Sequence, residues 1–132
     1  MPTSIKDECA IVGIGQTEFS RASGRSTLQL ACEAIKAAAD DAGLKVEDMK
    51  AIKTHNPFIV NDINMAKKMG IDVMKMNNYG CSLVYGHPQG PTAGRIIAEM
   101  LEELVILGGG YGLWAGCAAG DTAAAMVFKV GS

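Results

Sequence analysis

One histidine set among glycines and prolines is the residue of this sequence best placed for chemistry. His87 lies between Gly86 and Pro88, just before a helix predicted to begin near Pro91. Free backbone N–H groups and the helix dipole at such a start favour negative charge nearby, and glycine at position 90 lets a ligand approach the backbone. The arrangement suits stabilisation of a thioester enolate or oxyanion. A surface histidine in a tight loop explains the local pattern equally well.

A cysteine near the C-terminus is the second candidate. Cys117 follows a glycine, precedes two alanines and lies close to the apolar stretch 122–130. A thiol can shuttle a proton when nearby N–H groups or a histidine lower its pKa. Without further context, a small buried side chain is the simpler interpretation. The other cysteines, Cys9, Cys32 and Cys81, form no CxxC spacing, so no metal site is expected.

The elements that must position these residues alternate between strands and helices. Apolar runs predict strands at 10–15, 51–54, 73–76, 111–116 and 122–130, and helical spacing predicts helices at 26–42, 61–69 and from 91 onward. The order β-α-β-α-β-α-β-β predicts an α/β fold with one mixed five-stranded sheet, mostly parallel and covered by helices. A short link makes the last two strands antiparallel.

Local signals predict where two of these helices begin and end. Ser26 and Gln29 have the spacing of a capping box, and Gly43 suits the C-terminus of the first helix. Asn61 or Asp62 is the expected cap of the second helix, which the glycine at position 70 should end. The sequence GIG at 13–15 resembles part of a dinucleotide fingerprint, but position 18 is glutamate, so that reading is disfavoured.

The overall composition predicts a folded single domain over residues 1–132. Hydrophobic residues make up 48% and charged residues 20% of the chain, which has a formal net charge of −2. Such a chain folds, and without a basic stripe it is not expected to bind nucleic acid. We find no signal peptide and no segment long enough to span a membrane. We therefore expect a cytoplasmic protein with free cysteines.

Three motifs in order resemble those of the thiolase family. The segment NNYGCSLVYGHPQGPTAGR at 77–95 resembles the family's Asn-x-x-Gly…Gly-His-Pro motif, and GCAAGDTAAAMVFKV at 116–130 resembles its second-cysteine motif. The tetrapeptide HNPF at 55–58 resembles a third motif, which begins with histidine in the sterol-carrier and lipid-transfer type. Residues 9–44 resemble the opening strand and first helix of the same subgroup. The resemblance implies one half of a thiolase, of the acetyl-CoA acetyltransferase kind.

The resemblance implies a role for each matching residue. His87 would polarise the thioester oxygen and help to activate a nucleophilic cysteine, and Cys117 would be the acid/base. His55 would hold a water that completes an oxyanion hole, and Asn77 would orient a neighbour of the site. Support of the oxyanion and contact with substrate would fall to a further set of loop residues, namely Gly86, Gly120, Pro88 and Gly90.

The family's acyl-carrying cysteine motif has no counterpart in this sequence. The opening resembles a first thiolase half and the rest a second half, with a seam near 46–53. Neither Cys9 nor Cys32 is a plausible substitute, and Cys81 is a weak one. The helix after Pro91 carries an apolar stripe expected to be exposed on a monomer, which would favour a homodimer or pairing with a complementary thiolase-type subunit. Its members are Ile96, Ile97, Met100, Leu101 and Leu104.

Two functions follow as hypotheses. The first is an acyltransferase of lipid metabolism that performs Claisen condensation or thiolysis on acyl-CoA, impaired or inactive alone because the acyl-carrying motif is absent. It would use acyl-CoA as substrate and no cofactor. The second is a non-catalytic acyl-CoA-binding or oligomerising module that keeps the half-fold.

Overall fold

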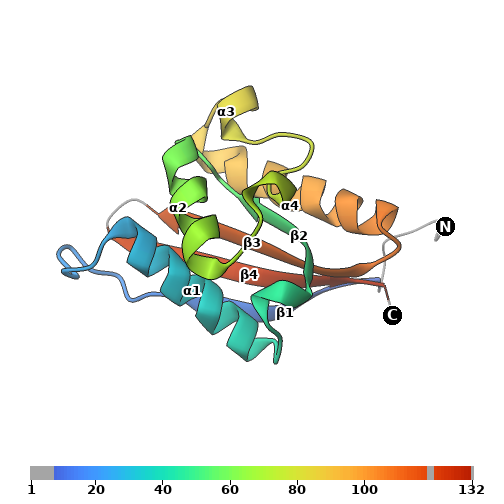
Figure 1. Ribbon diagram of the computed structural model, residues 1–132, viewed down its shortest axis with the longest axis horizontal. Helices are drawn as coiled ribbons and strands as arrows, with labels where there is room; N and C mark the ends of the chain where they lie inside the picture. Colours follow the sequence, from blue (N-terminus) through green and yellow to red (C-terminus); the bar gives the residue numbers. More distant parts are fainter. Residues whose placement is uncertain (1–7, 119–120, 132) are drawn as a thin grey trace.

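Four strands form one mixed sheet in the computed structural model, which describes residues 8–118 and 121–131. The strands are β1 (Cys9–Gln16), β2 (Met49–Thr54), β3 (Gly110–Ala118) and β4 (Thr122–Val130), in the order β1-β4-β3-β2. β4 is antiparallel to both of its neighbours and β2 is parallel to β3. Three strands therefore point one way and β4 the other (Figure 1). The predicted α/β class, mixed sheet and final antiparallel pair are confirmed. The expectation of a mostly parallel sheet is wrong, because β4 lies between β1 and β3 and runs antiparallel to both.

The predicted fifth strand at 73–76 is wrong. The chain there forms a 3-10 turn, η2 (Val73–Lys75), because the side chain of Asp72 accepts a hydrogen bond from the backbone N–H of Met74 at 3.0 Å. A side chain that bonds its own backbone in this way competes with strand pairing. Only Met76 reaches the sheet, as an isolated parallel bridge to Ile52.

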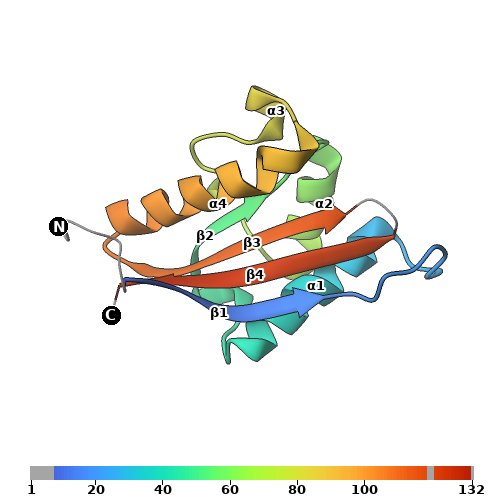
Figure 2. The ribbon, with the colours of Figure 1, turned by 180° about the vertical axis from the view of Figure 1, so that it is seen from behind.

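Helices cover both faces of the sheet and give a three-layer molecule. α1 (Thr27–Asp41) and α2 (Ile59–Met69) lie on one face, and α4 (Gln89–Ile106) lies on the other (Figures 1 and 2). α3 (Ser82–Tyr85) is a single turn in the loop before α4, and η1 (Val46–Asp48) leads into β2. Each interlayer space has its own apolar cluster, so β2, β3 and β4 are covered on both faces. The edge strand β1 is covered by α1 on one face, while Ile11 and Ile14 are exposed.

α1 packs directly onto β1, and two glycines make this possible. A Cβ on Gly13 would lie 2.2 Å from the carbonyl oxygen of Ala38, and one on Gly15 would lie 2.1 Å from that of Ala34. Both distances are far shorter than van der Waals contact. The GIG sequence therefore serves helix–strand packing.

The predicted ends of α1 are largely confirmed. Ser26 accepts a hydrogen bond from the backbone N–H of Gln29 at 3.2 Å. The Gln29 side chain does not return to Ser26 and instead bonds Glu33 at 3.0 Å, so only half of the capping box forms. Gly43 adopts a left-handed conformation with φ 67°, and the following residue bonds back to the last turn.

α2 begins earlier than predicted, at Ile59 rather than after Asn61 or Asp62. Its N-cap is Phe58, which provides no side-chain bond. Asp62 does not cap the helix because its buried carboxylate is taken by Thr54. The left-handed glycine expected at position 70 does end α2, with φ 71°.

The apolar stripe of α4 is not exposed, and that prediction is wrong. Ile96, Met100 and Leu104 are fully buried against the sheet, in a cluster with residues of β2, β3 and β4. The reason is that α4 turns this stripe towards its own sheet. Ile97 and Leu101 are half-buried at the border of the same cluster.

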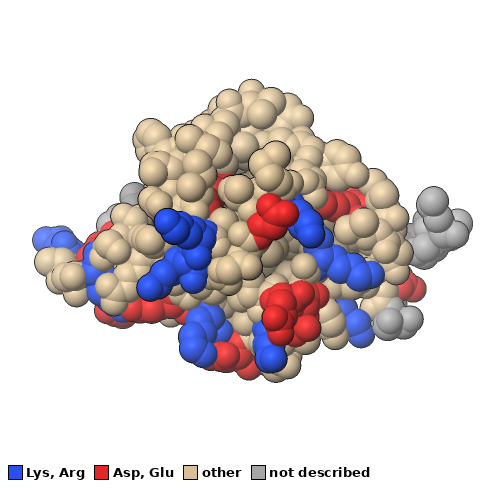
Figure 3. All heavy atoms as spheres, in the orientation of Figure 1, with Lys and Arg blue, Asp and Glu red and all other residues tan. Residues whose placement is uncertain are grey.

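Exposed apolar side chains gather at the start of α2 and on α3. In Figure 3 the upper part of the visible face, over these elements, carries no charged side chain. We call the set the α2–α3 surface, and its members are Phe58, Ile59, Val60, Ile63, Leu83, Val84 and Tyr85. Others lie apart from this group on β1, in loops and at the end of α4, namely Ile11, Ile14, Phe19, Met74, Tyr79, Ile106 and Leu107. No helix in the described part of the chain is long and apolar enough to cross a membrane.

Candidate active site

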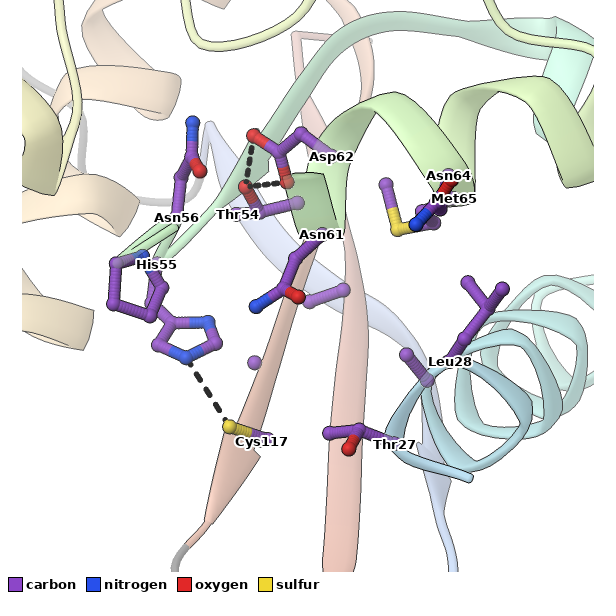
Figure 4. Close-up of a pocket in the computed structure, with 14 residues that line it drawn as sticks. Thr27, Leu28, Thr54, His55, Asn56, Asn61, Asp62, Asn64, Met65 and Cys117 are labelled. Atoms are coloured by element: carbon purple, nitrogen blue, oxygen red, sulfur yellow. Dashed lines mark hydrogen bonds between the residues drawn. The ribbon is translucent and has the colours of Figure 1, made fainter. Parts of the chain in front are cut away.

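The candidate site lies where the two parallel strands β2 and β3 end. The register pairs Thr54 of β2 with Ala115 of β3. The residues that follow these two in the chain therefore lie close together at one edge of the sheet. His55 follows β2 directly, and its Nε2 lies 3.2 Å from the Sγ of Cys117 on β3 (Figure 4). Two residues 62 positions apart in the chain thereby form a thiol–imidazole pair.

His87 stands beside this pair, on the loop between α3 and α4. Its ring centroid is 5.4 Å from that of His55, with the rings tilted by 59°. Its Nδ1 is 3.1 Å from the hydroxyl of Thr92, and that hydroxyl donates to the carbonyl of Pro88 at 2.8 Å. Because the hydroxyl's only proton is used there, Nδ1 must donate to it. The Nε2 of neutral His87 is therefore left as an acceptor.

The imidazole that bonds Cys117 is thus that of His55, since no hydrogen bond joins His87 to Cys117 among the residues described. Burial and the neighbouring His87 lower the pKa of His55. Burial raises the pKa of the Cys117 thiol, partly offset by a backbone hydrogen bond. Both shifts favour uncharged forms. At neutral pH the resting pair is a thiol beside a neutral imidazole.

A buried polar cluster holds the strand end from which His55 projects. Asn77 accepts a hydrogen bond from the backbone N–H of Thr54 at 2.8 Å and donates to the carboxylate of Asp62 at 2.6 Å. The Thr54 hydroxyl also donates to Asp62, at 2.7 Å. Burial raises the pKa of Asp62, and the bonds from Thr54 and Asn77 oppose that rise. We call this the Thr54–Asp62–Asn77 clamp. Asn77 thus bonds the residue before His55, and its orienting role in the reaction stays a prediction.

A second buried cluster holds the same strand to α4. The Lys53 ammonium, fully buried, lies 2.9 Å from the carboxylate of Glu103, which is 5% exposed. Lys53 also donates to the backbone carbonyl of Asn78, and the Asn78 side chain donates to Glu103 at 2.8 Å. We call this the Lys53–Glu103–Asn78 clamp. The motifs do not include this clamp, although a lysine that follows Ala51 and Ile52 within a strand is itself a signal of a buried charge pair.

The remaining predicted residues lie around the start of α4. Gly86 has φ 80°, a conformation that favours glycine. Pro88 is the N-cap of α4 without a side-chain cap, and Gly90 has open space where a Cβ would be. The start of the helix is therefore open at Gly90, and contact of Pro88 and Gly90 with substrate stays a prediction. Gly120 lies outside the described residues.

The other three cysteines are free and lie outside the thiol–imidazole pair. Cys81 is buried and accepts a long contact, 3.5 Å, from the side-chain amide of Asn56. Cys9 starts β1, and Cys32 lies inside α1 as expected. Within the described residues, no three His, Cys, Asp or Glu side chains are grouped to hold a metal ion.

A pocket of about 80 Å³ opens beside the thiol–imidazole pair. Leu28 and Ala31 of α1 and Met65 of α2 line it, with His55 and Cys117 at its edge (Figure 4). Sequence analysis did not find this pocket because its walls come from elements that meet only in the folded chain.

Comparison with known proteins gives a consistent result. Residues 16–130 match the model of the thiolase C-terminal domain. A steroid side-chain-cleaving aldolase from Thermomonospora curvata is 41% identical over 100 residues, which cover 74% of this chain and 25% of that protein. A 3-ketoacyl-CoA thiolase from Shewanella amazonensis is 38% identical over 106 residues, covering 67% of this chain and 24% of that one.

Solved structures show the same fold. Human mitochondrial 3-ketoacyl-CoA thiolase, also solved in complex with CoA, superposes with a TM-score of 0.79 at 24% identity. The match covers 94% of this chain and 31% of the human one. The chain spans about a quarter of the length of the curated relatives it matches. By its fold, its motifs and the family model that covers most of its length, the chain belongs to the thiolase family.

Proposed function

We propose that this chain carries the proton-transferring half of a thiolase-type active site. Its substrates would be acyl-CoA thioesters, and the reaction would be Claisen condensation or its reverse, thiolysis, as in an acetyl-CoA C-acyltransferase. The observation that carries the proposal is the 3.2 Å contact between Cys117 Sγ and His55 Nε2, with a second imidazole beside it. The family's thiolases and the CoA complex of the human relative support the substrate class.

Cys117 and His55 would move the proton of the condensing acyl group. The neutral imidazole of His55 accepts the thiol proton at Nε2, and the thiolate then removes a proton from the carbon next to the thioester carbonyl. The electron pair of that C–H bond moves to the carbonyl oxygen and forms an enolate. The lowered pKa of His55 keeps it an acceptor at neutral pH.

His87 would act on the thiol that carries the other acyl group. Its free Nε2 can accept a proton from a nucleophilic thiol, after which the imidazolium N–H can donate to a thioester oxygen that becomes negative. Thr92 holds Nδ1 throughout, so the reactive nitrogen is always Nε2.

The acyl-carrying cysteine would come from outside this sequence. We propose that a complementary thiolase-type subunit supplies this cysteine, and that the chain alone, or paired with a second copy of itself, is impaired in the full reaction. The α2–α3 surface supports a partner because apolar side chains gathered on a surface usually mark an interface. Sedimentation at micromolar concentration should give a dimer or larger species, and a monomer would contradict self-pairing.

A second candidate is aldol-type cleavage of a carbon–carbon bond beside a thioester. It is favoured by the relative named as a steroid side-chain-cleaving aldolase. Such cleavage needs a base to take the proton of a β-hydroxyl group and donors that stabilise the resulting enolate, but no acyl-carrying cysteine. Cys117, His55 and His87 supply these group types.

Incubation with three thioesters separates the possibilities. Acetyl-CoA in D₂O should gain deuterium at its methyl carbon, read by NMR, because enolate formation requires only the groups in this chain. A 3-ketoacyl-CoA with free CoA tests thiolysis, and a 3-hydroxyacyl-CoA that releases an aldehyde or ketone identifies the aldol reaction. Binding of acetyl-CoA with no exchange and no product would overturn the catalytic proposal and leave a binding module.

A further inference from the structure

The pocket beside Cys117 has a size and lining that point to a specific ligand group. We propose that it binds the acyl chain of the thioester whose reacting carbon lies at Cys117, and that it selects short chains of about three to four carbons. The inference rests on the proposed function, since it places the substrate's carbonyl end at the thiol–imidazole pair. His55 and Cys117 form one edge of the pocket, so a group held at the thiol can extend directly into it (Figure 4).

The lining favours a hydrocarbon chain. Most of the surface that faces the cavity is apolar, and its lining includes Leu28, Ala31, Met65 and Ala115 beside polar residues of the start of α2. The one carboxylate in the wall, that of Asp62, already accepts hydrogen bonds from the Thr54 hydroxyl and the Asn77 amide. The wall therefore offers an incoming ligand no carboxylate that lacks a partner. A hydrocarbon chain would gain binding free energy by leaving water for this surface.

The volume limits the length of the chain. The cavity measures about 80 Å³, roughly half of the 150 Å³ of an apolar cavity that holds benzene. On that scale the cavity holds about three carbon atoms, and a fourth can lie at its open mouth. Leu28 of α1 and Met65 of α2 line the pocket on the side away from Cys117 (Figure 4).

Alkyl methanethiosulfonates of increasing length test the pocket without requiring thioester turnover. The Cys117 thiolate attacks the sulfenyl sulfur, a disulfide forms, and methanesulfinate leaves with the electron pair while the thiol proton passes to the base or buffer. Rates at Cys117 are read by peptide mass spectrometry and divided by those of N-acetylcysteine with the same reagent. We expect the ratio to rise about fourfold per methylene as far as propyl or butyl, and then to stop rising.

Two substitutions should move this optimum in opposite directions. Leu28→Ala enlarges the pocket and should shift the optimum to longer chains. Ala31→Leu fills the pocket, so the rate ratio should no longer rise with alkyl chains longer than methyl. Ala98→Leu makes the same change on the exposed side of α4, across the sheet, and should leave the wild-type profile unchanged. S-butyryl-N-acetylcysteamine should slow modification of Cys117 more than the acetyl compound does.

The outcomes test the acyl-chain assignment of the pocket separately from the proposed reaction. A flat series in the wild type, an optimum that ignores both pocket variants, or equal protection by acetyl and butyryl thioesters would overturn the pocket assignment. A chain-length optimum that moves as described supports the pocket even if deuterium exchange into acetyl-CoA fails. Exchange with a flat series would instead keep the proposed function and reject the acyl-chain site.

Discussion

Two kinds of polar cluster meet at the end of β2, and they differ in burial and in how firmly their members are bonded. The Thr54–Asp62–Asn77 and Lys53–Glu103–Asn78 clamps are largely buried and linked by short hydrogen bonds or an ion pair. Cys117, His55 and His87 are half-buried or exposed, and a single contact of 3.2 Å joins the thiol to an imidazole. The contrast indicates that the clamps fix geometry while the looser trio is free to exchange protons.

The largest effect on stability should come from the buried ion pair. Lys53→Met removes the partner of the Glu103 carboxylate, and breaking a buried pair on one side costs about 3–5 kcal/mol. Urea unfolding measures the loss. The double variant Lys53→Met/Glu103→Leu should recover most of it, because the unpaired charge is gone. A single variant that loses less than about 1 kcal/mol would show that the pair is not a clamp.

The second clamp should give a smaller loss. Asp62→Ala leaves the Thr54 hydroxyl and an Asn77 N–H buried without an acceptor, at about 1–3 kcal/mol in unfolding free energy. Asp62→Asn keeps one carbonyl acceptor for Thr54 and should lose less. Equal stability of the alanine variant and the wild type would mean that the buried donors find other partners.

Thr92 links the buried residues to the reacting trio, because it is itself buried and orients His87. Thr92→Val removes the acceptor of His87 Nδ1 and should slow a reaction that needs His87 Nε2 by about tenfold, the equivalent of about 1.4 kcal/mol in the barrier. Thr92→Ser keeps the hydroxyl and should restore the rate. If serine and valine variants are equally slow, Thr92 acts through packing alone.

The smallest effect should appear in the pH dependence of stability. Because burial and His87 lower the pKa of His55 in the folded chain, the unfolded chain binds more protons than the folded chain once the pH falls below about 6.5. The free energy of unfolding should therefore decrease as the pH falls through that value. His55→Gln should show less of this decrease in urea midpoints at pH 7, 6 and 5, and parallel curves would contradict the lowered pKa.

Periodicity and turn residues were sufficient to predict α1, β4 and the antiparallel hairpin, because these depend on local spacing. The strand predicted at 73–76 failed since Asp72 closes a local turn, which an apolar run alone does not reveal. The stripe of α4 was read correctly as apolar but assigned to the wrong environment. Whether an apolar face meets the chain's own sheet or a partner depends on tertiary packing.

The site was predictable by residue type but not by contact. Motif order identified His55, His87 and Cys117, yet their arrangement depends on the register between β2 and β3, which pairs residues about 60 positions apart. Apart from Asn77, the members of the clamps were missed because they lie on elements distant in sequence. Thr92 was missed for another reason: its contact with His87 spans only five positions, but no motif marks it. Lys53 was the one visible signal, a charged residue that directly follows Ala51 and Ile52 in the predicted strand at 51–54.

The most direct test of the account compares Cys117→Ser with Asp62→Asn in the exchange of deuterium into acetyl-CoA. Rates are measured by NMR in D₂O and corrected for the folded fraction. We predict that Cys117→Ser keeps the stability of the wild type but loses at least about 100-fold in exchange rate, whereas folded Asp62→Asn keeps most of its exchange. Wild-type exchange by Cys117→Ser would contradict the assignment of the proton-transferring thiol.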